Sequence, residues 1–516
     1  MTARKARRTQ SRVLANRMIV AALVVLALGG LYGVAGLSRP MALTSAARAS
    51  SLGELPVTSA LVACPAPGSG GLTGGGVAVA SAPAGPGSGK LTLTALGRAA
   101  GGQPTAPVLV PTQPGELTVR PVRSAKAEPG KAGTLPAMAG GRVPTSVGRG
   151  GLIVSATGAD AQGFDVEQLG PDGQPTARCA SPGSDFWFVG PGAVTLHTDL
   201  YLINTDSQQA DANVSVITDS GPLFGLADSG IVVPPHGMVV QDLDKLLHSA
   251  KAVALHVTTS TGRVVAAVRQ TTSQSKAGGW LPVAAEPATS EVIAGLPASG
   301  GARELYITVP GGRSARVKVT AITPRGSYQP TGGSSISLLP KLTAAIALPS
   351  LAGSAASIEI TSNVPVTAAL ELPGGPDGAP GALAAGSAAV TGQGVIAASP
   401  DGSAGSTDLV LSAPGGAARV RIGEAGPGVS LTGQAGQVVP IPAKSSVEVK
   451  ITLPKHGPKA PVIAIIVTPL AGSGPVYGAR LAGSGGTLRT VLPLLPSPAR
   501  VGLPYVRDSL TAVLGP

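Results

Sequence analysis

The chain has 516 residues and a formal net charge of +12. A single hydrophobic core stops growing well below this length, so the sequence predicts several domains. Charged residues make up only 12% and apolar residues 43%, which excludes a highly charged, disordered chain. Aromatic residues make up 2%, so the cores must consist mainly of Ala, Val, Leu and Ile, side chains that suit pleated sheets.

Half of the net charge lies at the N-terminus. Residues 1–17 contain no acidic residue and six basic ones, namely Arg4, Lys5, Arg7, Arg8, Arg12 and Arg17. The remaining positive excess is spread over the rest of the chain, without the dense basic face or aromatic platforms that nucleic-acid binding requires. Nucleic acid is therefore not an expected partner, whereas a weak attraction to anionic wall polymers is compatible with the charge.

An apolar segment follows this basic tail. Residues 18–37 form a run of twenty uncharged residues, and about 20 helical residues span the hydrocarbon core of a bilayer. The positive-inside rule keeps residues 1–17 in the cytoplasm and exports everything beyond a juxtamembrane linker at 38–52. The sequence thus predicts a single-pass signal-anchor helix in the cell membrane, with the bulk of the chain extracytoplasmic. A cleaved signal peptide, with Ala47-Arg48-Ala49 as its cleavage site, is the alternative.

Two cysteines, Cys64 and Cys179, stand in similar Pro- and Ser-containing phrases. An exported chain with two cysteines is most simply read as carrying one disulfide, because that compartment is oxidising. We therefore predict a disulfide-bearing β domain over 53–183. A stretch at 124–150 is rich in Gly, Pro and basic residues without a period, and it is predicted to be a long loop in this domain.

Downstream, one pattern recurs about every 105 residues. An apolar strand, a turn and a strand of the type Asp-Leu-Tyr-Leu-Ile place Leu200, Leu305 and Leu409 at equivalent positions. Each unit then closes with another apolar strand. The predicted modules are 184–289, 290–393 and 394–516, the last with a closing C-terminal strand.

Strands inside these modules show a period of two. Arg316 and Lys318 alternate with Val317 and Val319, which is typical of a strand with one buried face and one wet face. Even spacing, short strands and Gly/Pro turns favour an all-β chain of tandem antiparallel, immunoglobulin-like sandwiches. The closing strand at 491–495 could pair back onto another module, so a closed, propeller-like β ring is the alternative.

A search for catalytic or ligand-binding motifs finds none that is complete. No Gly-x-Ser-x-Gly is present, and the phosphate-loop-like stretch Gly85–Lys90 lacks its first Gly and its final Ser or Thr. His197 and Asp199 should point to the same side of one strand, yet no third ligand is evident. Residues 239–248 have the Leu spacing of a short helix. The sequence therefore predicts no catalytic, cofactor-binding or metal-binding residues.

The densest aromatic cluster is Phe186, Trp187 and Phe188. On a strand, Trp187 faces away from its two neighbours. The simplest interpretation is core packing close to Cys179. If Trp187 were exposed, the cluster would be an interaction surface for a sugar ring or a partner protein.

Three stretches resemble a family of actinobacterial envelope proteins known as domain of unknown function 5719. They are the start Val62-Ala-Cys-Pro65, the block from Arg178 to Gly190, and the strand Leu200-Tyr-Leu-Ile-Asn204. The resemblance implies export and membrane anchoring but no activity. The expected function is that of a non-enzymatic, membrane-anchored structural or scaffolding protein of the cell envelope, in contact with wall polymers or other envelope proteins. The alternatives are an array of modules that bind wall glycan or another polymer, and an envelope hydrolase with a cleft that gathers His197, Asp199 and other carboxylates.

Overall fold

A computed structural model of the chain describes residues 54–65, 76–82, 87–95, 108–111, 142–144, 151–170, 175–193, 196–223, 230–272, 278–298, 301, 303–348, 351, 354–373, 381–398, 406–425, 436–452, 462–484 and 487–502. The chain divides into two units, Met1–Glu54 with Gly502–Pro516, and Leu55–Val501. Nearly all described residues belong to the second unit. They are almost entirely β, with a single α-helix, α2 (Asp244–Leu247), and a 3-10 turn at Ala159–Ala161.

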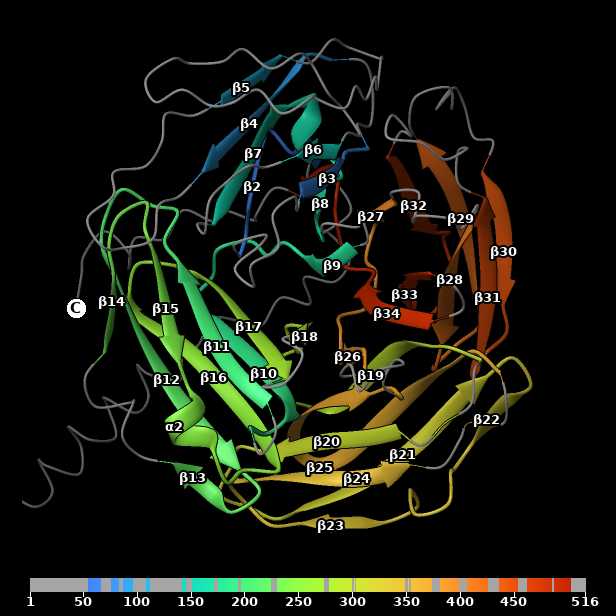
Figure 1. Ribbon diagram of the computed structural model, residues 1–516. Coiled ribbons are helices and arrows are strands. Elements are labelled where there is room, and N and C mark those ends of the chain that lie inside the picture. Colours follow the sequence, from blue (N-terminus) through green and yellow to red (C-terminus); the bar gives the residue numbers. More distant parts are fainter. Residues whose placement is uncertain are drawn as a thin grey trace, which may run out of the picture. The chain divides into compact units, whose positions relative to one another are not determined.

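The strands of this unit fall into four successive sets, which we call sandwiches A, B, C and D (Figure 1). Sandwich A contains β2 (Ser59–Cys64), β3 (Gly76–Ala80), β4 (Gly89–Ala95), β5 (Val108–Pro111), β6 (Arg142–Pro144), β7 (Leu152–Gly158), β8 (Asp165–Leu169) and β9 (Pro175–Arg178). Sandwich B contains β10 (Asp185–Pro191), β11 (Leu196–Ile203), β12 (Ala210–Thr218), β13 (Gly221–Leu223), β14 (Ile231–Val233), β15 (Met238–Asp242), β16 (Ala252–Thr261), β17 (Val265–Thr272) and β18 (Gly278–Leu281).

Sandwich C contains β19 (Ala288–Leu296), β20 (Arg303–Val309), β21 (Ala315–Thr323), β22 (Gly326–Tyr328), β23 (Ile336–Leu338), β24 (Leu342–Leu348), β25 (Ala356–Glu371) and β26 (Leu383–Ala385). Sandwich D contains β27 (Gly394–Ala398), β28 (Ser406–Ala413), β29 (Ala418–Ala425), β30 (Gln437–Ile441), β31 (Ser445–Thr452), β32 (Ile463–Pro469), β33 (Tyr477–Ser484) and β34 (Thr487–Pro493). Two short strands, β1 (Glu54–Pro56) and β35 (Arg500–Gly502), pair with each other.

All four sandwiches share one strand order. If the strands of each are numbered 1 to 8 along the chain, one sheet has the order 1-6-3-4 and the other 5-2-7-8, with antiparallel pairing throughout. In sandwich B, β13 and β14 share position 4, as do β22 and β23 in sandwich C. In C, positions 6 and 7 are one continuous strand, β25, which joins the two sheets.

This order differs from that of an immunoglobulin domain, in which the first strand pairs with the second. Here the first strand pairs with the sixth in every sandwich, because the chain crosses to the other sheet after strand 1. The likeness to immunoglobulin domains therefore extends only to two antiparallel sheets around one apolar core. The first sandwich has the same order as the other three, so the disulfide-bearing domain is a fourth copy of the module.

The period of two seen in the sequence decides which side chains enter each core. In β21, Val317 and Val319 are buried while Arg316 and Lys318 are exposed, as predicted. Strands at positions 1 and 6 are instead buried on both faces. In β27, Ile396 and Ala398 enter the core of sandwich D, whereas Val395 and Ala397 form a separate cluster against sandwich A.

Such second clusters connect each sandwich to the next. In each contact the outer face of a 1-6-3-4 sheet lies against the outer face of the following 5-2-7-8 sheet. The A–B contact contains Ile153 and Tyr201, and the B–C contact contains Trp187 and Tyr306. Many other contact residues are Ala, whose small side chains allow sheets to approach closely. Low aromatic content and high alanine content thus follow from sheets that are packed on both faces.

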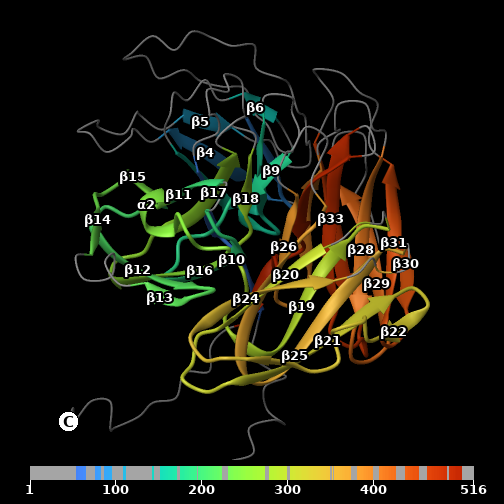
Figure 2. The same cartoon turned by 60° about the horizontal axis from the view of Figure 1, so that its bottom comes forward.

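The same type of contact continues from C to D and from D back to A. Val410, Ala479 and Leu481 of sandwich D join the core cluster of C, and Val395 and Ala397 of D pack against Ala78 and Ala80 of A. Figures 1 and 2 show sandwich D, in orange and red, beside the yellow sandwich C. Within the unit Leu55–Val501, the contacts therefore run A–B–C–D–A and close on themselves. The backbone N–H of Val57 also donates to the carbonyl of Ala499, 2.9 Å away, so the two ends of this unit meet.

The eighth strands of the four sandwiches also contact one another. β18 contacts β26, β26 contacts β34, β34 contacts β9, and β9 contacts β18. Figure 1 shows these four strands toward the middle of the view.

Several sequence-based predictions concern residues outside those described. They are the basic tail 1–17, the apolar segment 18–37, the linker 38–52 and, apart from β6, the loop 124–150. Across the described ranges, no helix has the length and apolar character needed to span a membrane. The predicted helix at 239–248 is shorter than expected, because its first part is strand β15 and only Asp244–Leu247 is helical.

Candidate functional site

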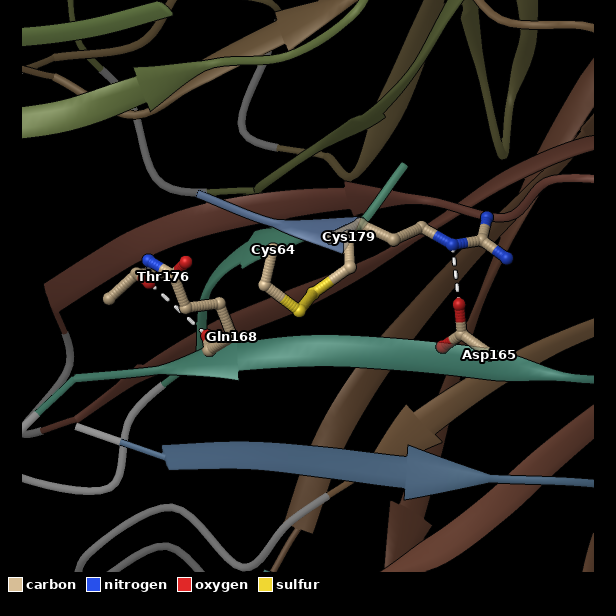
Figure 3. Close-up of a disulfide and its surroundings, with 6 residues drawn as sticks. Cys64, Asp165, Gln168, Thr176 and Cys179 are labelled. Carbon is tan, nitrogen blue, oxygen red and sulfur yellow. Dashed lines mark hydrogen bonds and ion pairs between the residues drawn. A yellow bond between two sulfur atoms is a disulfide. The ribbon is translucent and has the colours of Figure 1, made fainter. Parts of the chain in front are cut away.

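The predicted disulfide is present between Cys64 and Cys179. Cys64 ends the first strand of sandwich A, and Cys179 follows its eighth strand directly. Figure 3 shows the bond near Asp165 and near the hydrogen bond between Gln168 and Thr176. Asp165 also forms an ion pair with Arg178. The disulfide therefore ties together the two ends of sandwich A, next to β9, which is one of the strands through which A contacts D.

The aromatic cluster on β10 is buried. Phe186 and Phe188 lie in the core of sandwich B, and Trp187 lies on the opposite face in the B–C contact. Trp187 is 6% exposed and stacks on His256 with ring centroids 3.9 Å apart. These residues are therefore packed in the interior, as in the first interpretation. They do not form an exposed interaction surface, because both faces of β10 are covered by sheets.

The D–A contact carries a buried ion pair. Arg480 of β33 and Glu167 of β8 both have side chains with 0% exposure. Nη1 of Arg480 donates to both carboxylate oxygens of Glu167, each 2.9 Å away, and to the carbonyl of Ala397 at 3.0 Å. Nε donates to Oγ1 of Thr407 at 3.1 Å. Two charges taken out of water are thus held by an ion pair, in which one nitrogen contacts both carboxylate oxygens, and by further hydrogen bonds, which is the condition for such a pair to persist.

A second ion pair supports the same contact. Nε of Arg178 donates to Asp165, and its Nη1 donates to the carbonyl of Pro493 in sandwich D, 3.1 Å away. The other carboxylate oxygen of Asp165 accepts from the backbone N–H of Ala397 at 2.7 Å. Asp165 and Arg178 of sandwich A therefore bind backbone groups of D directly, which fixes the register between the two sandwiches.

On the surface of sandwich B, four side chains that can bind a metal lie together. His197 and Asp199 project from β11, Asp242 ends β15, and Asp244 begins α2. One ligand atom each from His197, Asp242 and Asp244 lie within 4.8 Å of one another, and Nε2 of His197 is 3.4 Å from a carboxylate oxygen of Asp199. The pairing of β11 with β15 places Asp242 opposite Asp199, and α2 then adds Asp244, so two further carboxylates that were not evident in the sequence lie beside His197.

Hydrogen bonds fix the backbone around this cluster. Nδ1 of His197 contacts Oδ2 of Asp244, whose Oδ1 accepts from the backbone N–H of Thr198 at 2.7 Å. The hydrogen bond that His197 donates to Asp244 raises the pKa of His197, although partial burial opposes the shift. Burial raises the pKa of Asp199, and the nearby charges of Asp242 and Asp244 raise it further, while His197 lowers it. Three carboxylates are therefore crowded around one imidazole.

A small cavity lies where the four sandwiches meet. Its volume is about 50 Å³, and it is lined by residues of all four sandwiches, including Thr176, Trp280, Glu371 and Thr490. Ligand pockets for organic molecules typically measure about 300–1,000 Å³. This cavity has room for water rather than for a sugar ring.

Sequence reasoning missed Asp242, Asp244, Glu167 and Arg480 as members of these clusters. The spacing of Asp242 and Asp244 after two valines was visible, but the strand that would face them was not. Arg480 gave no signal, since a lone arginine in an apolar strand is usually assigned to a solvent-facing position.

Comparison with known proteins gives one match, to a family model. No curated protein and no solved structure matches the chain. The model of a family of unknown function, DUF5719, matches residues 137–452, which covers most of sandwich A's second half, all of B and C, and much of D. The chain therefore belongs to the DUF5719 family.

Proposed function

We propose that the protein is a non-enzymatic, membrane-anchored structural or scaffolding protein of the cell envelope, with the unit Leu55–Val501 outside the membrane. The observation that carries the proposal is the closed succession of contacts A–B–C–D–A. Each sandwich is held on both sides, so the positions of the loops and edge strands are fixed relative to one another. A rigid mount for other envelope components needs this property, whereas a flexible chain of modules lacks it.

The disulfide supports the extracytoplasmic part of the proposal. Disulfides persist in oxidising compartments and are rare in the cytosol. Cys64 and Cys179 are both buried in sandwich A, where the bond has a structural position and no reactive thiol is offered. The apolar segment 18–37 and the basic residues before it supply the anchor and its orientation.

Two measurements on intact cells test the proposal. Protease added from outside should remove a C-terminal tag from the full chain but not from a variant lacking residues 18–37, which stays in the cytosol. A membrane-impermeant crosslinker should then link the full chain to the same envelope proteins in repeated experiments. A tag that is cleaved only after lysis, or crosslinks only to cytosolic proteins, would overturn the proposal.

A second candidate, binding of an anionic wall polymer, is favoured by one repeated feature. The turn before strand 5 presents an exposed basic residue with positive φ in sandwiches B, C and D: His236 (48°), Lys341 (54°) and Lys444 (55°). Positive φ is uncommon for residues other than Gly and often marks functional positions. Replacing Lys341 and Lys444 by Glu should weaken sedimentation with purified anionic wall polymer, and unchanged sedimentation would remove this candidate.

A further inference from the structure

The cluster on sandwich B combines ligands from three chain elements. His197 and Asp199 belong to β11, Asp242 to β15 and Asp244 to α2. All four side chains are partly or fully exposed, so they can adjust around an ion. Two ligands that each lie about 2.1 Å from one zinc ion can be at most about 4.2 Å apart. For His197, Asp242 and Asp244 the observed separations, up to 4.8 Å, lie within a small side-chain rotation of that limit.

The other sandwiches provide an internal comparison for this position. The acidic residue before the repeated Leu is Asp199 in B, Glu304 in C and Asp408 in D. Directly opposite on strand 5 stand Asp242 in B, Ala347 in C and Lys450 in D. In D the carboxylate thus faces an ammonium group, whereas in B it faces a second carboxylate. Like charges directly opposite one another destabilise a strand pair.

The carboxylates of the cluster outnumber the cationic side chains beside it. Asp199, Asp242 and Asp244 contribute three negative charges. Arg269, opposite Asp199 on β17, contributes one positive charge, and its guanidinium carbon lies 5.7 Å from the ring centre of Trp280. A divalent cation would take the place that Lys450 fills in sandwich D.

We infer that His197, Asp242 and Asp244 form a binding site for one divalent transition-metal ion, Zn²⁺ or Mn²⁺, with Asp199 beside it. Imidazole favours zinc and related metals, and carboxylates favour manganese, magnesium and calcium. A set of one imidazole and two carboxylates therefore favours Zn²⁺ or Mn²⁺ over Mg²⁺ and Ca²⁺. The ion would connect strands 2 and 5 of sandwich B to α2 and remove the repulsion between Asp199 and Asp242.

The test uses the full chain, purified in detergent and stripped of metal with a chelator. Equilibrium dialysis against Zn²⁺, Mn²⁺, Mg²⁺ and Ca²⁺ should show one equivalent of Zn²⁺ or Mn²⁺ bound. Asp242→Asn and His197→Ala should each weaken binding at least tenfold. Asp408→Asn, at the equivalent strand position of sandwich D, and His256→Ala, in the other His–Asp pair of sandwich B, are matched controls and should leave binding unchanged.

Circular dichroism verifies that each variant is folded, and the electron paramagnetic resonance spectrum of bound Mn²⁺ reports the ligand sphere directly. Loss of the protein-bound Mn²⁺ signal in Asp242→Asn but not in Asp408→Asn would support the site. The inference is overturned if the chain binds no stoichiometric metal, if Ca²⁺ or Mg²⁺ binds more tightly than both Zn²⁺ and Mn²⁺, or if the control variants lose binding to the same extent as Asp242→Asn.

Discussion

Replacement of Arg480 tests how the D–A contact is held. Arg480 of β33 lies directly opposite Leu409 on the paired strand β28. The equivalent residues of sandwiches B and C are Val268 and Leu370. Arg480→Leu therefore installs the residue that sandwich C already tolerates. It also leaves the Glu167 carboxylate buried without its partner. Removing one member of a buried ion pair costs about 3–5 kcal/mol, so the free energy of unfolding should fall by that amount.

A second variant separates the ion pair from simple packing. The outward positions of the seventh strand carry Ala267 in B, Ala369 in C and Ala479 in D, where sandwich A carries Glu167. Adding Glu167→Ala to Arg480→Leu removes the unpaired charge. The hydrogen bonds of Arg480 to the carbonyl of Ala397 and to Oγ1 of Thr407 are then still lost, and the buried carbonyl left without this donor costs about 1–3 kcal/mol. The double variant should therefore be more stable than Arg480→Leu alone.

Urea unfolding followed by tryptophan fluorescence measures both changes. The chain has two tryptophans. Trp187 lies in the B–C contact, and Trp280 packs against the A–B cluster, so fluorescence reports on contacts between sandwiches. A loss below about 1 kcal/mol in Arg480→Leu, or a double variant less stable than the single one, would refute the reasoning.

Three further predictions follow from single features of the structure. The disulfide spans a separation of 115 residues. Cys64→Ser should therefore lower the free energy of unfolding by about 4–5 kcal/mol without reductant, and the variant and the wild type should be equally stable when both are reduced. Equal stability of the two proteins without reductant would contradict this. Burial raises the pKa of Glu291 well above its usual value of 4.5, so the folded state holds the proton more tightly than the unfolded state. Stability is then full below about pH 4.5 and falls, by at most about 1.4 kcal/mol per pH unit, as pH rises toward the folded pKa. Glu291→Gln should match the wild type at pH 4 and exceed it at pH 8 in urea midpoint, and a difference independent of pH would be evidence against a protonated Glu291. Gly295 has a φ of 86°, and a Cβ there would lie 2.5 Å from that of Ala479 in the next sandwich. Gly472 has a similar φ of 81°, but its surroundings are open. Gly295→Ala should therefore lower the melting temperature more than Gly472→Ala, and equal losses would show that backbone strain alone is responsible.

The sequence predicted features that depend on local pattern. Leu200, Leu305 and Leu409 all lie in the second strand of their sandwiches, and the alternation at Arg316–Val319 correctly separated exposed from buried positions. The disulfide followed from the number of cysteines and the expected compartment. Each of these inferences needed only neighbouring residues or a count.

Features that depend on pairing between distant strands could not be predicted. The meeting of His197 with Asp242 requires the register of β11 against β15, and nothing in either segment specifies that register alone. The sequence did not show that sandwich A is a copy of the same module. Its strands at positions 4 and 5 are separated by residues 112–141, and these strands have few residues in common with those of the other copies. The second, contact-forming face of strands such as β27 was equally hidden, because Ala is common on every kind of surface.

The closure of the contacts has a consequence for shortened or rearranged versions of this chain. Every sandwich has one contact face on its 1-6-3-4 sheet and another on its 5-2-7-8 sheet. Removal of any single copy therefore leaves two complementary apolar faces without partners. Head-to-tail contacts that fail to close within one molecule continue into the next, and they produce filaments or exchanged domains. Loss or gain of one copy would therefore convert a discrete particle into a polymer, which places a strong constraint on how the copy number can change during evolution.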